Sequence, residues 1–347
     1  MSIDSGNLAD APGLTDGVQP TPQRSPSRSV GGPRSIVKRV ASARETGLAA
    51  VLIVLIAFLA WRSPFFFTVG NLTVVSRQIA LSLFLSVGMT FVILSGAIDL
   101  SVGSVVALAS ITVGSVMVDG GQSPYVAVVA GLAVGAVIGA ANGILVVRTK
   151  VPSFIITLGM LAIARGLALG FTQGATISGL PDSFLTLGQG VSLGVPNPVW
   201  IVAVVALIAH VTLTRTTFGR HVYFIGSNEQ AARLSGIRVD RVKIAIFMIC
   251  STLAALSAVI ETARLSVGQP SAGSGYELAA IGGVIIGGAS LFGGEGSILG
   301  TILGTALLGI ILNGLILLSI SAYWQQVFSG AIIIIAVSLN TWRQRSR

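Results

Sequence analysis

Charged and metal-binding side chains are scarce in this chain of 347 residues. Asp, Glu, Lys and Arg together make up 10% of it, and it contains one cysteine and two histidines. The single cysteine, Cys250, excludes an internal disulfide and a thiolate cluster that could hold a metal. His210 and His221 have no neighbouring ligand at metal-binding spacing. We therefore expect no metal site.

Lysine is the scarcest basic residue, and its positions exclude a nucleotide site. None of Lys38, Lys150 and Lys243 follows a glycine-rich loop and precedes Ser or Thr, so no phosphate cradle is present. The glycine-rich string 287–304 lacks the strand that precedes a dinucleotide fingerprint, and it is interpreted as a tight turn plus packing. We also find no pairing of a nucleophile with a base. The sequence predicts no catalytic residues and no cofactor bound by this chain.

Apolar residues and glycine are abundant instead. Hydrophobic residues make up 53% of the chain and there are 43 glycines, a mixture outside the range of soluble domains. Because one helical crossing of a bilayer takes roughly 20 apolar residues, the stretch 48–342 supplies about ten crossings. We predict an all-α, polytopic transmembrane helical bundle rather than a soluble core. The candidate spans are 48–67, 72–94, 99–118, 124–147, 153–172, 198–214, 243–263, 277–292, 297–318 and 324–342.

Residues 1–46 are rich in Ser, Pro, Gly and Arg and have almost no apolar periodicity. Such a segment cannot bury enough surface to offset its chain entropy, so a disordered basic cytoplasmic tail is expected. The following apolar run is too far from the start for a signal peptide and predicts an uncleaved first helix. Residues 47–342 then form the membrane domain, and 343–347 a short cytoplasmic C-terminal tail.

The basic residues predict the orientation. With the N-terminus inside, all but four of the 21 Lys and Arg residues fall on the cytoplasmic side, most of them in the tail and in the 215–243 loop. An even number of crossings places both termini in the cytoplasm. The net charge of +9 therefore follows one membrane face and does not indicate a nucleic-acid groove. The four exceptions are Arg62, Arg77, Arg165 and Arg264.

Glycines recur every fourth residue in two spans. One series is Gly131, Gly135, Gly139 and Gly143, and the other is Gly296, Gly300 and Gly304. This spacing lets helix backbones approach closely inside a membrane. A surface that slides during transport is one interpretation, but static close packing in the bundle is favoured.

The longest cytoplasmic loop, 215–243, contains a predicted short helix at 228–234. Asn228 is a candidate N-cap, Glu229 suits the positive end of the helix dipole, and Gly236 closes the helix. A short helix lying along the membrane is suited to docking a partner protein. An ordinary amphipathic surface helix explains the composition equally well.

Asp99 is the one carboxylate inside the first half of the bundle. An acid at membrane depth can belong to an ion path, as in an ion-coupled secondary transporter. Asp99 also stands where the third span begins, so capping free backbone N–H groups is the favoured role. A proton relay would need several such groups, whereas Glu261, Glu277 and Glu295 fall near span ends.

Three arginines are candidates for docking an extracytoplasmic delivery protein: Arg62, Arg77 and Arg264, with Arg165 reaching toward the same side. They can pair with carboxylates on such a protein. The default interpretation is that they anchor helices by snorkelling to the membrane surface.

Four stretches resemble the membrane permease subunits of ribose-, xylose- and galactose-type ABC importers, in the same order along the chain. They are 88–104, with GMTFVILSGAIDLSVGS; Asn142-Gly143 to Arg165-Gly166, with Pro152; 226–237, with GSNEQAARLSGI; and Gly273 to Gln326, with GSGYE, two glycine pairs, Asn313-Gly314 and WQQ. Ala97 and Ala279 depart from the family pattern, which has a glycine and an acid there.

The resemblance implies a homodimeric or paired permease in a bacterial inner membrane. ATP is used by a separate cytoplasmic ATP-binding subunit, a periplasmic sugar-binding protein delivers the solute, and the helices move as rigid bodies. The loop residues that match the family's coupling segment are Gly226, Asn228, Glu229, Ala231, Ala232, Ser235 and Gly236.

We expect the chain to pass a monosaccharide, such as a ribose-like pentose or a hexose, without altering it. The candidate pathway or gating residues are Ser95, Asp99, Ser101, Ser104 and Asn142, although intramembrane Ser and Asn commonly bond across helices. An ion-coupled secondary transporter of a small polar solute is the alternative, and a membrane scaffold or enzyme is a third class.

Overall fold

The computed structural model describes residues 43–345, which lie in one folded unit. The predicted N-terminal tail lies, up to residue 42, outside the described residues, as do the last two residues of the predicted C-terminal tail. The first helix begins at Ala43, before the predicted end of the N-terminal tail, and the last continues to Arg345.

Helices dominate the described residues, as the composition predicted. The ten apolar helices are α2 (Ala43–Arg62), α3 (Val69–Leu94), α4 (Val102–Val118), α5 (Pro124–Thr149), α6 (Ser153–Thr172), α8 (Asn197–Arg215), α11 (Val239–Leu265), α12 (Tyr276–Ile286), α13 (Ile298–Leu317) and α14 (Ala322–Arg345). Three short helices connect them: α7 (Asp182–Gln189), α9 (Thr217–Ser227) and α10 (Glu229–Leu234). Two antiparallel pairs of two-residue strands complete the described chain: β1 (Ile177–Ser178) with β4 (Val267–Gly268), and β2 (Val191–Ser192) with β3 (Val195–Pro196).

Seven of these helices are long and apolar enough to cross a membrane. The other three predicted spans coincide with shorter apolar segments, Val102–Val118, Tyr276–Ile286 and Tyr323–Ile335. At 1.5 Å per residue, α12 is only about 16 Å long, roughly half of a hydrocarbon core. A helix of this length is too short to cross a membrane alone.

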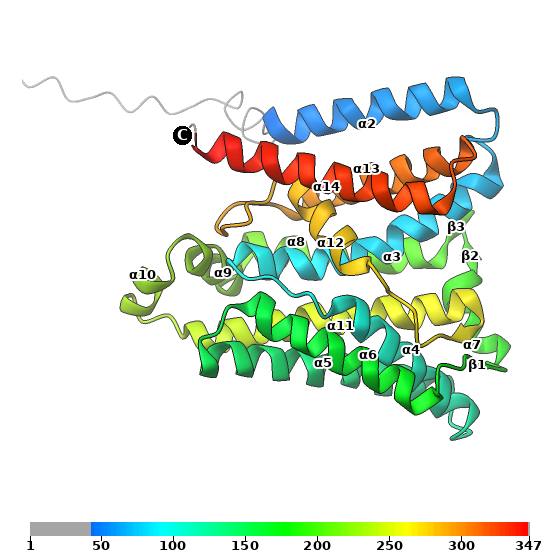
Figure 1. The fold of residues 1–347 in the computed structure, drawn as a ribbon, viewed down its shortest axis with the longest axis horizontal. Helices are drawn as coiled ribbons and strands as arrows, with labels where there is room; N and C mark the ends of the chain where they lie inside the picture. The colour runs from blue at the N-terminus through cyan, green and yellow to red at the C-terminus, as the bar shows by residue number, and fades with distance from the viewer. Residues whose placement is uncertain (1–42, 346–347) are drawn as a thin grey trace, which may run out of the picture. The chain divides into compact units, whose positions relative to one another are not determined.

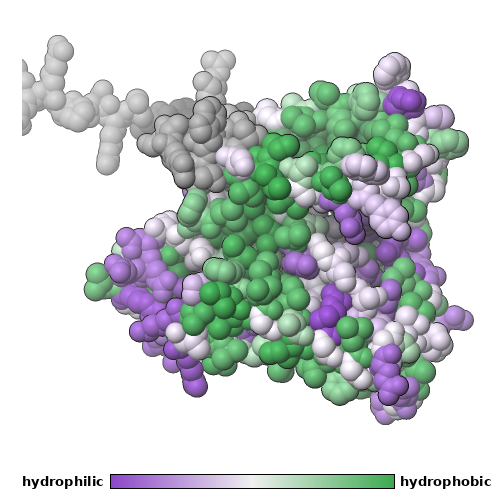
Figure 2. Space-filling view, viewed as in Figure 1, coloured by the Kyte–Doolittle hydropathy of each residue, from purple (hydrophilic) through white to green (hydrophobic). Residues whose placement is uncertain are grey.

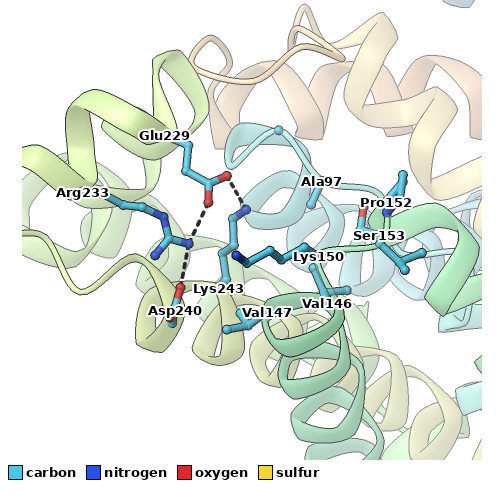
Figure 3. A pocket seen from close by; sticks show the side chains of 12 residues that line it. Ala97, Val146, Val147, Lys150, Pro152, Ser153, Glu229, Arg233, Asp240 and Lys243 are labelled. Carbon is cyan, nitrogen blue, oxygen red and sulfur yellow. Dashed lines mark hydrogen bonds and ion pairs between the residues drawn. The ribbon is translucent and has the colours of Figure 1, made fainter.

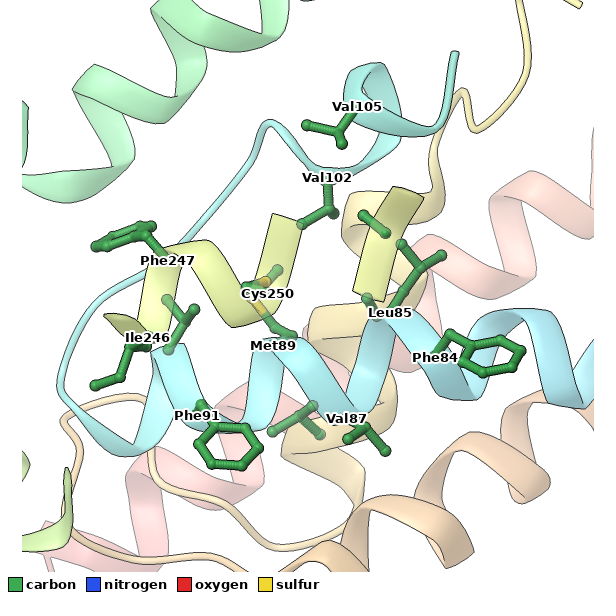
Figure 4. Close-up of a cluster of buried hydrophobic side chains, with 14 of the residues drawn as sticks. Phe84, Leu85, Val87, Met89, Phe91, Val102, Val105, Ile246, Phe247 and Cys250 are labelled. Carbon is green, nitrogen blue, oxygen red and sulfur yellow. The ribbon is translucent and has the colours of Figure 1, made fainter. Parts of the chain in front are cut away.

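The central helix of the bundle is α3. It packs against α11, α13, α12 and α8, and it is the most buried of the long apolar helices. In Figure 1, α5, α6 and α11 lie on one side of α3, and α2, α13 and α14 on the other. The core at this crossing contains Phe84, Met89 and Phe91 of α3 with Phe247 and Cys250 of α11, all at most 2% exposed (Figure 4).

The glycine series of α5 packs directly on α11. A Cβ atom on Gly139 would lie 2.5 Å from the Phe247 carbonyl oxygen, and one on Gly143 would lie 2.6 Å from the Ile244 Cα. The predicted close packing is confirmed. The second series is shorter than predicted, because Gly296 precedes α13, while Gly300 and Gly304 meet the backbone of α12.

Candidate coupling and translocation site

The predicted short helix in the longest loop is present as α10. The side chain of Asn228 accepts a hydrogen bond from the Ala231 N–H at 2.9 Å, as expected of an N-cap. Ala232, on the inner face of the helix, is fully buried, and Ser235 is the C-cap. The chain then turns at Gly236, whose φ of 80° is one that a residue with a side chain rarely adopts. Local sequence thus determines this helix.

Three ion pairs, one within α10 and two from α10 to the start of α11, are together called the clamp. Lys243 Nζ lies 2.6 Å from Glu229 Oε2, and Arg233 lies 2.9 Å from Glu229 Oε1 and 2.7 Å from Asp240 Oδ1. Figure 3 shows the four side chains converging between the two helices. Of these four residues, only Glu229 was predicted from the sequence to belong to the coupling segment. Its partner Lys243 could not be predicted, because it follows fourteen residues later and no local rule links the two.

The clamp alters the acidity of Glu229. Partial burial acts to raise the pKa of its carboxyl group, but hydrogen bonds from Lys243 and Arg233 outweigh burial, and the pKa lies below its ordinary value of 4.5. Glu229 is therefore ionised throughout the neutral range and keeps both cations in place.

A pocket of about 560 Å³ opens beside the clamp. Its remaining wall comes from Gly96 and Ala97, which follow α3, and from the end of α5 through the start of α6, residues 146–153. In Figure 3 the side chain of Lys150 extends into this pocket. The described residues contain no group of three His, Cys, Asp or Glu side chains able to hold a metal. The pocket is instead a mixed-charge surface suited to polar protein contacts.

Gly226 occupies a junction at the end of α9, just before α10. A Cβ atom there would collide with the Leu94 carbonyl oxygen and lie 2.6 Å from the Gly294 nitrogen. Gly294 N–H also donates to that Leu94 oxygen at 2.9 Å. A Cβ atom on Gly293 would likewise lie 2.8 Å from both the Gly226 carbonyl oxygen and the Gly96 nitrogen. The ends of α3 and α9 and the α12–α13 connection therefore meet backbone to backbone.

Asp99 does not cap a helix as predicted. It accepts hydrogen bonds from the backbone N–H of Ser101 at 2.8 Å and from the Ser101 hydroxyl at 2.6 Å. Helix α4 begins only at Val102, and its N-cap Ser101 makes no capping bond with its side chain. The carboxylate thus shapes the non-helical segment 95–101 before the helix, because α4 starts three residues later than the predicted span.

Among the predicted pathway residues, the structure brings together Asp99, Ser101 and Asn142. The Asn142 amide donates to the Ser101 hydroxyl at 2.9 Å. Ser95 bonds to the Val92 carbonyl within its own turn, and the buried Ser104 hydroxyl has no partner among the described residues. All five are at most 5% exposed, so they pack inside the bundle in this conformation.

Two hydroxyls of α6 hold the segment 95–101 in place. Ser153 accepts the Ile98 N–H at 2.9 Å, and Thr157 accepts the Leu100 N–H at 3.0 Å. Within a membrane, such partners are what make non-helical backbone tolerable. The sequence did not identify them, because serine and threonine inside an apolar helix carry no signal of a distant backbone partner.

The three candidate docking arginines lie in different surroundings. Arg77 donates to the Gln189 carbonyl at the end of α7, and the Gln189 amide donates to the Arg264 carbonyl at 3.1 Å. Arg77 and Arg264 thus flank α7 and are only partly exposed, whereas Arg62 is exposed at the end of α2. Arg165 turns inward to a connecting segment.

Comparison with known proteins agrees with this architecture. Residues 71–337 match the family described as the permease component of branched-chain amino acid transport systems. The ribose import permease protein RbsC of Escherichia coli strain K12 is 43% identical over 92% of this chain and 99% of its own length. RbsC of Bacillus subtilis strain 168 is 43% identical over 84% and 89%, respectively, and the D-allose transport system permease protein AlsC of E. coli K12 is 37% identical over 85% and 90%. No solved structure matches the chain. The chain therefore belongs to this permease family, as a multi-pass membrane component that is not itself an ATPase.

Proposed function

We propose that the chain is the membrane permease of a binding-protein-dependent ABC importer for ribose or a similar monosaccharide. The observation that carries this proposal is full-length similarity at 43% identity to a protein named as a ribose import permease. Relatives named for D-allose and L-arabinose transport are 37% and 35% identical. Ribose is therefore the first solute to test.

The coupling surface for a cytoplasmic ATP-binding subunit is α10. Leu234 at its end is 91% exposed, while Ala232 on its inner face is fully buried. A short helix with an apolar tip and a fixed base fits into a groove of a partner, where one buried apolar anchor contributes much of the affinity. Gly226, Asn228, Glu229, Ala231, Ser235 and Gly236 shape this helix and its ends.

The proposed topology has ten crossings, made by the ten apolar helices, with both termini cytoplasmic. Its support is the gathering of basic residues around α9 and α10 and the alternation of helices through the bundle. The importer contains a second permease copy, and the apolar outer faces of the helices contact lipid or that copy.

The delivery protein docks at the opposite end, near α7 and the β2–β3 hairpin. Leu193 at the hairpin tip is 93% exposed with a φ of 55°, an unfavourable combination for leucine that indicates a binding role. Arg62, Arg77 and Arg264 supply positive charge at this end for carboxylates of the partner.

Solute passes when the cluster around Asp99 and Asn142 moves with α4 and α5. The pocket beside the clamp touches Gly96 and Ala97, so a pull on α10 reaches this segment through adjoining structure. The ATP-binding subunit supplies the energy by shifting the permease from one conformation to another, and this chain performs no chemistry itself.

Reconstitution tests this proposal. The permease, its ATP-binding subunit and a ribose-binding protein are incorporated into proteoliposomes, and uptake of labelled ribose is measured. We expect uptake that requires ATP and the binding protein. Gly236→Arg or Ala232→Glu should abolish co-purification of the ATP-binding subunit while leaving membrane insertion intact. Uptake driven by a proton or sodium gradient without ATP would favour the secondary transporter instead.

A further inference from the structure

The connection between α11 and α12, residues 269–275, is non-helical, with Pro270, Ala272 and Gly273 buried and Ser271, Ser274 and Gly275 exposed. Arg165 of α6 donates to the Pro270 carbonyl at 3.0 Å and to the Ala272 carbonyl at 2.8 Å. Arg165 is twelve residues after the start of α6, so it lies about 18 Å along a helix of about 30 Å. The connection thus reaches roughly 10 Å below the far end of α6.

The starts of α4 and α12 meet at this depth. Arg165 also donates to the Gly103 carbonyl in the first turn of α4, at 3.3 Å. A Cβ atom on Gly103 would collide with the Gly273 carbonyl and with the carboxylate of Glu277, the second residue of α12. Glu277 interacts electrostatically with the Arg165 guanidinium. A charged pair therefore lies between the first turns of two helices.

This region is not sealed by the rest of the chain. Ser271, Ser274 and Gly275 are exposed, and Arg165 and Glu277 are partly exposed. A Cβ atom on Gly275 would have open space around it. Figure 2 shows polar residues in the middle of this face, over α4, α6 and the α11–α12 connection, with apolar residues around them.

Lipid is excluded as the neighbour of such a surface. Irregular backbone at membrane depth is tolerated only where it is buried in protein or lines a water-filled space, because hydrocarbon offers no hydrogen bonds. The exposed hydroxyls and carbonyls of 271–275 therefore face water or a second protein chain. The five pathway residues expected from the sequence are buried and offer no such surface.

We propose that Arg165, Ser271, Ser274 and Glu277 form a surface of the translocation pathway that contacts sugar hydroxyl groups. This inference rests on the proposed function. A carboxylate accepts hydrogen bonds from hydroxyl groups, a guanidinium donates to them, and serine does both, so the set suits a neutral polyol. Arg165 already donates three hydrogen bonds to backbone carbonyls, and these hold the guanidinium in place. Few of its N–H groups remain for a sugar, so it binds the sugar only weakly. A translocation pathway must bind its solute weakly, because the solute has to be released on the other side.

Cysteine labelling, followed on the permease itself, tests this surface without a background from the natural Cys250, which is fully buried. Ser271→Cys and Ser274→Cys are each reconstituted with the ATP-binding subunit and the ribose-binding protein. They are treated with a charged, membrane-impermeant methanethiosulfonate. The control is Val204→Cys, on an apolar face of α8 where Val204 is 56% exposed.

We expect labelling at positions 271 and 274 to be at least about tenfold faster than at 204. The reagent reacts with the thiolate, and a thiol ionises readily only where water reaches it. Saturating ribose should slow labelling at 274, and Glu277→Gln should raise the KM for uptake more than it lowers kcat. Disulfide formation between two copies at 274, without labelling at either serine position, would show a subunit interface and overturn the inference. Slow labelling at all three positions in every nucleotide state would also overturn it. A wild-type complex that takes up no ribose would refute the proposed function instead, and a complex that takes up ribose with both serine positions unlabelled would refute this inference alone.

Discussion

Replacing Lys243 by methionine breaks the best-protected ion pair of the clamp while keeping most of the side chain's length. Lys243 is 16% exposed and Glu229 38%, whereas Arg233 and Asp240 are 48% and 51% exposed. Exposed pairs contribute a few tenths to about 1 kcal/mol, so after discounting for solvent we assign about 1 kcal/mol to the Lys243–Glu229 pair. A loss of about 1 kcal/mol lowers the ratio of clamped to released α10 about fivefold.

The assay is a double-mutant cycle of Lys243→Met and Glu229→Gln. Two quantities are followed: thermal unfolding of the purified permease, and the number of ATP molecules hydrolysed per ribose transported. We expect a coupling energy of about 1 kcal/mol between the two sites, and a rise in ATP consumed per ribose while the ATP-binding subunit remains bound. Lys150→Met is the matched control, because it removes a cation from the same pocket without breaking any of the three ion pairs.

The reversed pair, Glu229→Lys with Lys243→Glu, decides between a clamp and a simple charge effect. The swap restores the attraction between positions 229 and 243 but replaces the Glu229–Arg233 pair by a repulsion, so it should recover part of the lost coupling. Strictly additive single mutations, together with a swap that restores nothing, would refute the assignment of these residues as the link between α10 and α11.

Three further predictions concern packing, charge and pH. Gly139→Ala should lower the free energy of unfolding by about 1–3 kcal/mol, because its Cβ atom would meet the α11 backbone. The control, Gly159→Ala, adds a Cβ atom that meets nothing within 4 Å and should not lower it, and thermal unfolding compares the two. Asp99→Ala should cost about 1–3 kcal/mol by leaving the buried Ser101 N–H unpaired, whereas Asp99→Asn keeps an acceptor there and should cost less, so equal losses would contradict the geometry. Since the pKa of Glu229 is lowered in the folded state, the stability contributed by the clamp should persist above pH 4.5 and disappear only as the pH falls through that lowered pKa; unfolding measured against pH should lose this dependence in Glu229→Gln.

Local features of the fold could be predicted from the sequence alone. Helix α10 formed as expected, because Asn228 and Gly236 act within a few residues of the helix that they end. The long apolar helices follow from hydrophobic length, and the close approach of α5 to α11 follows from glycine spacing.

The shortness of α4 and α12 could not be predicted in this way. The predicted spans 99–118 and 277–292 extend past the helix ends at Val102 and Ile286, because Leu100, Leu291 and Phe292 are apolar although the chain is not helical there. A count of hydrophobic residues cannot separate such chain, held by distant partners, from helix. Those partners, such as Thr157 for the Leu100 N–H and Arg165 for the Ala272 carbonyl, are about 60 and 100 residues away, respectively. The clamp was missed for the same reason.

The junction at Gly226 has a mechanical consequence. Amide groups of Leu94 and Gly294 meet there directly, so no flexible side chain is present to absorb a displacement. The end of α9, the end of α3 and the α12–α13 connection must travel as a single piece or separate completely. Spin labels placed on any two of the three should then report one unchanged distance if they travel together, or a jump to a second, longer distance if they separate, and never a gradual drift.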